Sequence, residues 1–84
     1  MRAIITGATK GIGRATTEVF AKNGFDVAIC ARTEADLEAF KKELNSTYPD
    51  VEVLIQVVDM SKKEAVKGFA NFVTQHWDSV EELV

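Results

Sequence analysis

Cysteine and long apolar stretches are the first things that this sequence lacks. Cys30 is the only cysteine, so no internal disulfide can form, which favours a reducing, intracellular setting. There is no uninterrupted apolar run of the ~18 residues that a membrane helix needs. No long apolar stretch follows the N-terminal charge, so we expect no signal peptide. By elimination, the sequence predicts a cytoplasmic protein with no membrane partner.

Positive charge is also scarce, and it is scattered. The chain has 10 Lys and Arg residues against 13 Asp and Glu, for a net charge of −3. The cations form no basic patch, which argues against a nucleic acid partner. The 84 residues are 46% hydrophobic and 27% charged, with 5 Gly and 1 Pro, which is an ordinary globular composition. This length predicts a single domain, residues 1–84, of marginal stability, because so small a chain buries little more than ~60% of its surface.

Short apolar runs alternate with segments of helical periodicity, which is typical of βαβ units and a parallel sheet. The runs predict strands over 2–6, 25–31 and 51–59, and residues 79–84 resemble the start of a fourth strand. Because such crossovers are right-handed in nearly all proteins, we expect the spatial order 3-2-1, with the fourth strand beside the first. The fold class is therefore α/β. It is a Rossmann-type, three-layer αβα parallel sheet, of which only the first βαβαβα half and a truncated fourth strand are present.

A sheet that ends in mid-strand is expected to leave the outer edge of its first strand unpaired. We therefore hypothesise that the chain is a truncation, or the ordered portion of a longer protein.

The helices are predicted from their periodicity and their end signals. The first spans about 12–23 and is followed by Gly24, placed for a left-handed C-terminal cap. The second follows Thr33 and stops before Pro49, and the third follows Ser61. The tetrapeptides that open these two helices resemble capping boxes; they are Thr33-Glu34-Ala35-Asp36 and Ser61-Lys62-Lys63-Glu64. Each helix is expected to have one apolar stripe: Ile12, Ala15, Val19 and Phe20 on the first, Leu37, Phe40 and Leu44 on the second, and Val66, Phe69, Val73 and Trp77 on the third.

A glycine-rich loop joins the first strand to the first helix, with the sequence Thr6-Gly7-Ala8-Thr9-Lys10-Gly11-Ile12-Gly13. A helix N-terminus carries unpaired N–H groups and partial positive charge, so it attracts phosphate. Gly7 can supply a tight turn, Gly11 can let backbone approach a pyrophosphate, and Gly13 can let the helix pack closely on the strand. The loop fails the Gly-Lys-Ser/Thr requirement of Walker A, which argues against kinase or ATPase chemistry.

The motif Thr-Gly-x-x-x-Gly-Ile-Gly at the end of the first strand resembles the cofactor motif of the short-chain dehydrogenases/reductases. Ala31-Arg32 after the second strand and Asp59 at the end of the third extend the resemblance, which covers residues 1–84. The resemblance implies an oxidoreductase that transfers hydride between a nicotinamide cofactor and a small-molecule carbonyl or alcohol substrate. It also implies that the intact protein is a homo-oligomer.

The choice of nicotinamide cofactor depends on the end of the second strand. An acid there would bond the ribose 2′-OH of NAD, but the position holds Ala31, followed by Arg32. Arg32 and Lys10 can hold a 2′-phosphate, and Thr9 and Thr33 can add hydroxyl bonds, so we expect NADP(H) rather than NAD(H). Taken singly, Lys10 and Arg32 also fit solvated surface charges. The candidate cofactor-binding residues are Gly7, Thr9, Lys10, Gly11, Ile12, Gly13, Arg32, Thr33, Asp59 and Met60.

Two interpretations remain open for Asp59. In the family that the chain resembles, an Asp here accepts a hydrogen bond from the adenine amino group, and the next residue, here Met60, contributes its backbone. The alternative is that Asp59 only shapes the turn before Ser61. Cys30 is expected to be a buried small hydrophobe, and with a single Cys and a single His we expect no metal site.

The resemblance also implies catalytic residues that these residues do not include. They are a Ser and a Tyr-x-x-x-Lys motif, whereas Tyr48 is the only tyrosine and no Lys follows it at that spacing. We therefore expect no catalytic residue within 1–84. A non-catalytic module that binds or senses NADP(H) is the alternative function. A flavodoxin-like domain without a dinucleotide is a third, which the glycine spacing argues against.

Overall fold

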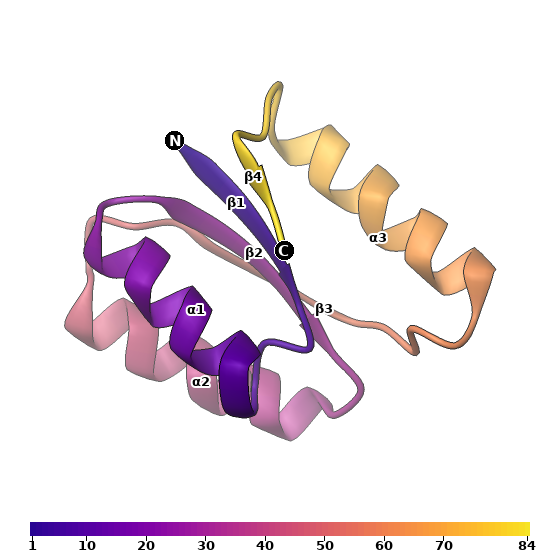
Figure 1. Cartoon of the computed structure of the whole chain (residues 1–84), viewed down its shortest axis with the longest axis horizontal. Coiled ribbons are helices and arrows are strands. Elements are labelled where there is room, and N and C mark those ends of the chain that lie inside the picture. Colours follow the sequence, from indigo (N-terminus) through magenta and orange to yellow (C-terminus); the bar gives the residue numbers. More distant parts are fainter.

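The computed structural model describes residues 1–84 as one parallel sheet covered by helices on both faces (Figure 1). The elements in chain order are β1 (Arg2–Thr6), α1 (Gly11–Lys22), β2 (Asp26–Ala31), α2 (Glu34–Thr47), β3 (Val53–Val57), α3 (Lys63–His76) and β4 (Glu82–Leu83). The four strands lie in the order β3-β2-β1-β4, and every pair is parallel. Helices α1 and α2 cover one face and α3 covers the other. The predicted Rossmann-type αβα architecture and strand order are confirmed.

Strand β2 lies at the centre of the sheet, with β1 and β3 on its two sides. Successive side chains of a strand point to opposite faces, so β2 contributes to both halves of the core. Val27 and Ile29 join the cluster under α1 and α2, while Ala28 and Cys30 join the cluster under α3. All four are fully buried, which is why the strand is apolar at every position after Asp26 rather than at alternate ones.

Strand β4 corrects the expectation that the outer edge of β1 is unpaired. It has only 2 residues, but the hydrogen bonds continue on both sides of it. The Glu81 N–H donates to the Arg2 carbonyl over 2.9 Å, and the Thr6 N–H donates to the Val84 carbonyl over 3.1 Å. The whole length of β1 is therefore bonded, and the open edge of the sheet is moved outward to β4.

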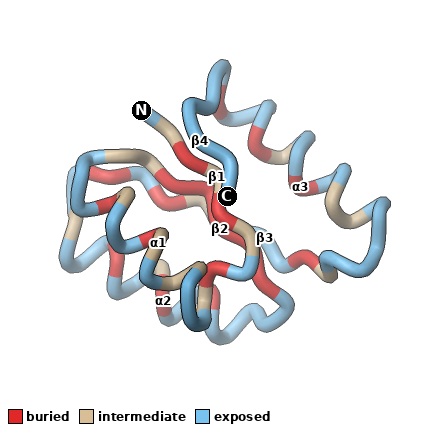
Figure 2. Tube along the Cα trace, viewed as in Figure 1, coloured by how far each residue is buried: buried red, intermediate tan, exposed pale blue.

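Of the apolar stripe predicted for α1, only Phe20 packs against the core, and the helix otherwise meets the sheet through smaller residues. Ile12 is 85% exposed and Val19 is 59% exposed, whereas Thr17 and Ala21 are buried (Figure 2). The Thr17 hydroxyl donates to the Gly13 carbonyl over 2.8 Å, which satisfies the one buried polar side chain. The reason is steric: at helical spacing, Gly13, Thr17 and Ala21 form a row of small residues that lets α1 lie close to the strands.

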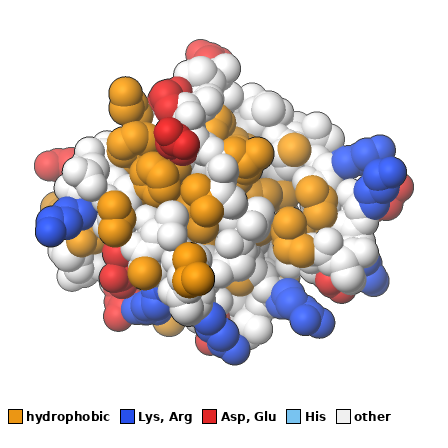
Figure 3. Space-filling view, in the orientation of Figure 1, with side chains coloured by type: hydrophobic (Ala, Val, Ile, Leu, Met, Phe, Trp, Pro, Cys, Tyr) orange, Lys and Arg blue, Asp and Glu red, His pale blue; other side chains and the backbone are white.

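The apolar side chains that α1 leaves exposed belong to a broader apolar face. Figure 3 shows hydrophobic side chains gathered over the side of the molecule that carries α1 and β4. The large exposed residues there and at the nearby chain ends include Met1, Ile12, Val19, Leu83 and Val84.

Helices α2 and α3 bury the side chains expected of them, but neither begins with a capping box. The N-cap of α2 is Thr33, whose side chain makes no capping hydrogen bond. The N-cap of α3 is Lys62, one residue later than predicted, and the Ser61 hydroxyl donates to Asp59 instead. Both predicted capping boxes are therefore wrong. In α3, by contrast, Phe69 and Val73 face the core as predicted, with Trp77 just beyond the helix.

Helices α1 and α2 are joined by Arg14. Its guanidinium pairs with Glu43 of α2 and with Glu18 on its own helix, and it lies 4.4 Å from the centre of the Phe40 ring. A cation over an aromatic face adds a favourable electrostatic contact to the packing of two helices.

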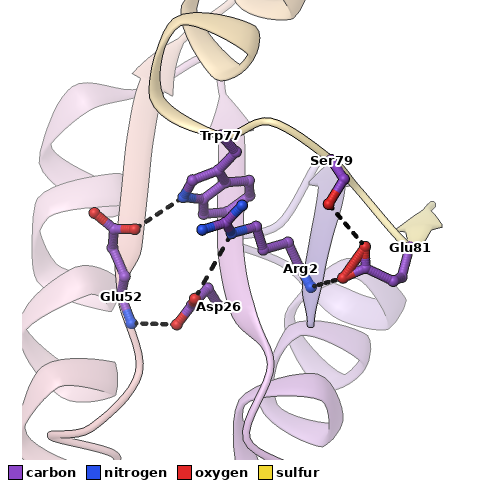
Figure 4. A network of polar contacts seen from close by, with 6 residues as sticks. All are labelled: Arg2, Asp26, Glu52, Trp77, Ser79 and Glu81. Carbon is purple, nitrogen blue, oxygen red and sulfur yellow. Dashed lines mark hydrogen bonds and ion pairs between the residues drawn. The ribbon is translucent and has the colours of Figure 1, made fainter.

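A polar network closes the amino-terminal end of the sheet (Figure 4). The Trp77 indole donates to Glu52 over 2.8 Å, and the Arg2 guanidinium lies 5.5 Å from the Trp77 ring centre. The Asp26 carboxylate accepts from the Glu52 N–H over 2.8 Å and pairs with Arg2 at 4.0 Å. The network ties the end of α3 to the starts of β1, β2 and β3.

Gly13 holds the first turn of α1 directly against the end of β1. A Cβ at this position would lie 2.2 Å from the Gly7 carbonyl oxygen, a distance that no side chain can occupy. Close packing of helix on strand, predicted for Gly13, is confirmed.

Replacing Phe40 by Ala should destabilise the chain severely, because Phe40 is 1% exposed and lies in the centre of its cluster. We expect the free energy of unfolding to fall by about 3–5 kcal/mol, enough to unfold much of a marginally stable chain. Val19→Ala, on the exposed stripe, should change it by less than about 0.5 kcal/mol. Urea unfolding followed by circular dichroism measures both variants. Equal losses in the free energy of unfolding would mean that α1 packs against the sheet through the side of the helix that carries Val19.

Gly13→Ala should lower the free energy of unfolding by about 1–3 kcal/mol or more, because the new methyl group overlaps backbone rather than a movable side chain. Gly68→Ala is the matched control: it lies inside α3 with no atom within 4 Å of the added Cβ. In that control, the free energy of unfolding should rise by about 0.5–1 kcal/mol, because Ala has a higher helix propensity than Gly. Thermal unfolding of the two variants should therefore shift in opposite directions, and a harmless Gly13→Ala would contradict the close contact.

Candidate functional site

One cavity lies at the carboxyl ends of the strands, between the segments that follow β1, β2 and β3. Its volume is about 490 Å³. We call it the loop pocket; it is lined by Gly7, Thr9, Lys10, Ala31, Arg32, Thr33, Asp36, Val58 and Met60. In open parallel sheets, ligands bind at this end, where loops diverge from neighbouring strands. Two other cavities of similar volume lie along the helices, and neither is lined by a residue of the glycine loop.

The glycine loop presents bare backbone on one side of this pocket. Gly7 has φ +60° and Gly11 has φ +56°, a left-handed region that other residues rarely adopt. Nothing lies within 4 Å of the position that a Cβ would take at either glycine, so the loop is open outward. The Ala8 N–H donates to the Cys30 carbonyl over 3.3 Å, which holds the start of the loop against β2.

Helix α1 starts directly from this loop, at Gly11. Its first turn contains no acidic residue, and its N-cap Lys10 makes no side-chain capping bond. The first N–H groups of the helix therefore have no side-chain acceptor, and the partial positive charge of the helix dipole is not neutralised there. An anion placed against the loop would contact these free N–H groups and be attracted by the helix dipole.

Two cations line the pocket from different loops. Lys10 comes from the loop after β1, and Arg32 comes from the loop after β2. Both side chains are exposed, and neither takes part in a hydrogen bond or ion pair within the chain. Thr9 and Thr33 stand next to them in sequence and also line the cavity. The pocket thus combines open backbone with free positive charge.

The floor of the pocket is apolar. Ala31 is 8% exposed and Val58 is 3% exposed, and the Val58 N–H donates to the Ala31 carbonyl over 2.9 Å. Beneath them, Cys30 is fully buried, with its Sγ 3.9 Å from the Sδ of Met60. Burial raises the pKa of the Cys30 thiol, against a smaller opposing effect from the Gly7 backbone, so the sulfur is a packing group and not a nucleophile.

The structure brings together six of the ten residues predicted from the sequence. Those that line the loop pocket are Gly7, Thr9, Lys10, Arg32, Thr33 and Met60. Gly11 and Gly13 do not line it: Gly11 begins α1 and Gly13 packs against the Gly7 carbonyl, and the contact of Gly11 with a pyrophosphate stays a prediction. Ile12 is 85% exposed and does not line the pocket.

Asp59 also lies outside the lining. Its Oδ1 accepts hydrogen bonds from the Ser61 N–H over 3.0 Å and from the Ser61 hydroxyl over 2.6 Å. These bonds lower the pKa of the Asp59 carboxyl, with smaller contributions from the charges of Arg32 and Lys62. The contacts match the interpretation that Asp59 shapes the turn, while its contact with an adenine stays a prediction.

Three residues of the lining were not among the predicted candidates: Ala31, Asp36 and Val58. Asp36 is the only one of the three with a polar side chain. The sequence pattern predicted that Asp36 belongs to a capping box, but Thr33 makes no such bond and the Asp36 side chain lines the cavity instead. Its position in the first turn of α2, beside the loop that carries Arg32, was the available signal.

None of the three helices combines the length and the apolar character needed to span a bilayer.

The whole chain, residues 1–84, matches the family model for short chain dehydrogenases. Among curated relatives, it is 41% identical over 71 residues to a very-long-chain 3-oxoacyl-CoA reductase of Caenorhabditis briggsae, covering 84% of this chain and 22% of that protein. It is 39% identical over 70 residues to an uncharacterized oxidoreductase of Mycobacterium tuberculosis, covering 82% of this chain and 28% of that protein. The chain thus spans only about a fifth to a quarter of the length of these relatives.

Solved structures agree in fold. An alcohol dehydrogenase from the archaeon Thermococcus sibiricus, complexed with 5-hydroxy-NADP, superposes with a TM-score of 0.92 at 35% identity, over 98% of this chain and 34% of that one. The L-sorbose reductase of Gluconobacter frateurii, complexed with NADPH and L-sorbose, superposes with a TM-score of 0.92 at 32% identity, over 98% of this chain and 31% of that one. With the glycine loop, the parallel sheet and a family model that matches from end to end, this chain belongs to the short-chain dehydrogenase family.

Proposed function

We propose that this chain forms the NADP(H)-binding part of an oxidoreductase that transfers hydride between the nicotinamide and a small carbonyl or alcohol substrate. One observation carries the proposal: the loop pocket joins the open glycine backbone to the unpaired cations Lys10 and Arg32. The cofactor-bound relatives named above support it, since they are similar over nearly the whole chain.

The glycine loop suits the pyrophosphate of a dinucleotide. Positive φ at Gly7 and Gly11 turns the backbone so that the loop carries no side chain at these two points. A doubly charged linker can then approach the N–H groups at the start of α1, where the helix dipole favours negative charge. The dinucleotide would extend along the carboxyl edge of the sheet from this point.

The residues around the end of β2 suit a 2′-phosphate better than a bare ribose. Ala31 occupies the position where a carboxylate would bond the 2′-OH of NAD, and it offers no polar side chain. The Arg32 guanidinium can donate paired hydrogen bonds to a phosphate, and Lys10 adds a second charge from a different loop. We infer that the cofactor is NADP(H) rather than NAD(H).

The contribution of residues 1–84 to the reaction is to bind and orient the cofactor. When bound, NADP(H) supplies the hydride chemistry itself. Tyr48, the only tyrosine, packs against the core under α1 and α2, at the far end of α2 from the pocket. It is therefore not placed to donate a proton to a substrate carbonyl.

Arg32→Ala should weaken the binding of NADPH by about 10- to 100-fold, because charge-assisted hydrogen bonds to the 2′-phosphate are lost. The binding of NADH should change by less than about threefold. Lys10→Ala should show the same selectivity with a smaller loss, since Lys is a single point charge.

Lys67→Ala is the matched control, because it removes one cation from the exposed side of α3, away from the pocket. Fluorescence or calorimetric titrations with NADPH and NADH at one fixed salt concentration measure all four proteins. Equal losses for both dinucleotides, or an Arg32→Ala variant that binds NADPH as tightly as the wild type, would contradict the assignment.

A further inference from the structure

The loop pocket contains one carboxylate, Asp36, among its cationic side chains. Asp36 is in the first turn of α2 and shares the cavity wall with Lys10, Arg32 and Thr33. No other Asp or Glu lines this cavity. A pocket built only to hold a phosphate would have no use for a negative charge, because like charges repel. The presence of Asp36 therefore requires its own explanation.

The helix dipole favours an acid in the first turn of α2, as it does at Glu34, but no partner within the chain holds the Asp36 carboxylate. The capping box that the sequence suggested is not formed, since the Thr33 side chain makes no capping bond. The Asp36 carboxylate takes part in no hydrogen bond and no ion pair with the rest of the chain. Its side chain is exposed. An acceptor that is free, exposed and on the pocket wall is available to a ligand.

The chemistry of a carboxylate distinguishes the two nicotinamide cofactors. An adenosine ribose with free 2′- and 3′-hydroxyls donates hydrogen bonds that a carboxylate accepts well. A ribose that carries a 2′-phosphate presents negative charge at the same place and is repelled. Asp36 can therefore supply, from the start of α2, the acceptor that Ala31 does not supply at the end of β2.

We propose that Asp36 is a specificity-determining residue: it accepts hydrogen bonds from the ribose hydroxyls of NAD(H) and opposes the 2′-phosphate of NADP(H). This inference rests on the proposed function, because it assumes that the ribose occupies the loop pocket. Its consequence is a smaller margin between the two cofactors. Arg32 and Lys10 favour NADP(H), and Asp36 limits how far NADP(H) is preferred over NAD(H).

The test compares Asp36→Asn with Glu34→Gln in titrations with NADPH and NADH. Both changes remove one acid from the first turn of α2, so they alter the helix dipole interaction alike, but Glu34 does not line the pocket. We expect Asp36→Asn to bind NADPH about threefold more tightly and NADH about threefold more weakly than the wild type. The preference for NADPH should therefore rise by about tenfold. Glu34→Gln should leave that preference unchanged. The gain in NADPH affinity should shrink at high salt, since the repulsion that it removes is screened.

The outcomes separate the two proposals. Failure of the wild-type chain to bind either dinucleotide would overturn the proposed function and this inference with it. Binding of NADPH that depends on Arg32, with the same preference in Asp36→Asn as in the wild type, would overturn the inference alone. A change of equal size in Glu34→Gln would also overturn it, because the effect would then come from the helix end as a whole.

Discussion

The contact between Gly13 and the Gly7 carbonyl is the constraint on which the rest of the structure depends. It brings the first turn of α1 against the end of β1, and the small residues Thr17 and Ala21 continue the same close approach along the helix. Because the helix starts so near the strand end, its N–H groups point into the space where the loops after β1, β2 and β3 diverge. A wider separation would leave the same glycines in a loop that faced only solvent. The position of the loop pocket beside the start of α1 is thus a consequence of packing.

The charged groups are paired at one end of the sheet and unpaired at the other. At the amino-terminal end, Arg2 and Asp26 pair with each other and Glu52 accepts from the Trp77 indole, so the polar groups satisfy one another. At the carboxyl-terminal end, Lys10 and Arg32 have no partner within the chain. Polar groups that are paired stabilise a fold, while unpaired charges around an apolar floor are available for a ligand. The difference is the one expected if the carboxyl end of the sheet binds the proposed cofactor and the amino end holds the strands together.

Much of the fold could be predicted from the sequence because the signals are local. Strand β2 is apolar from Val27 to Ala31 since both its faces are covered there, and Gly24, with φ +83°, caps α1 as glycine does in many helices. The glycine loop was identified by residue types whose geometry admits few alternatives. The strand order followed from the handedness of crossovers, which is nearly invariant.

The errors share one physical cause, competition that sequence patterns do not report. The hydrophobicity of Ile12 and Val19 predicted that they face the sheet. Instead, the row of small residues on α1 packs against the sheet, because side-chain volume decides how closely two backbones approach. Ser61 resembled an N-cap, but its hydroxyl donates a hydrogen bond to Asp59, two residues earlier. Asp36 resembled half of a capping box and lies instead on the pocket wall. In each case a pattern in the sequence named one environment, and a competing one prevailed: a local acceptor for Ser61, and packing or position in the fold for the others.

The central place of β2 has a consequence for how this chain opens. Its backbone is bonded to β1 on one side and to β3 on the other, and both of its faces are buried. Release of the short strand β4 or of a single helix breaks none of the backbone bonds of β2, because β4 pairs with β1 alone. Release of β3 would free the amides that β2 donates toward it, Val27 among them, while the pairing of β2 with β1 remains. The amides of β2 that face β1 are therefore the ones whose hydrogen exchange best records the global stability of the chain without any denaturant.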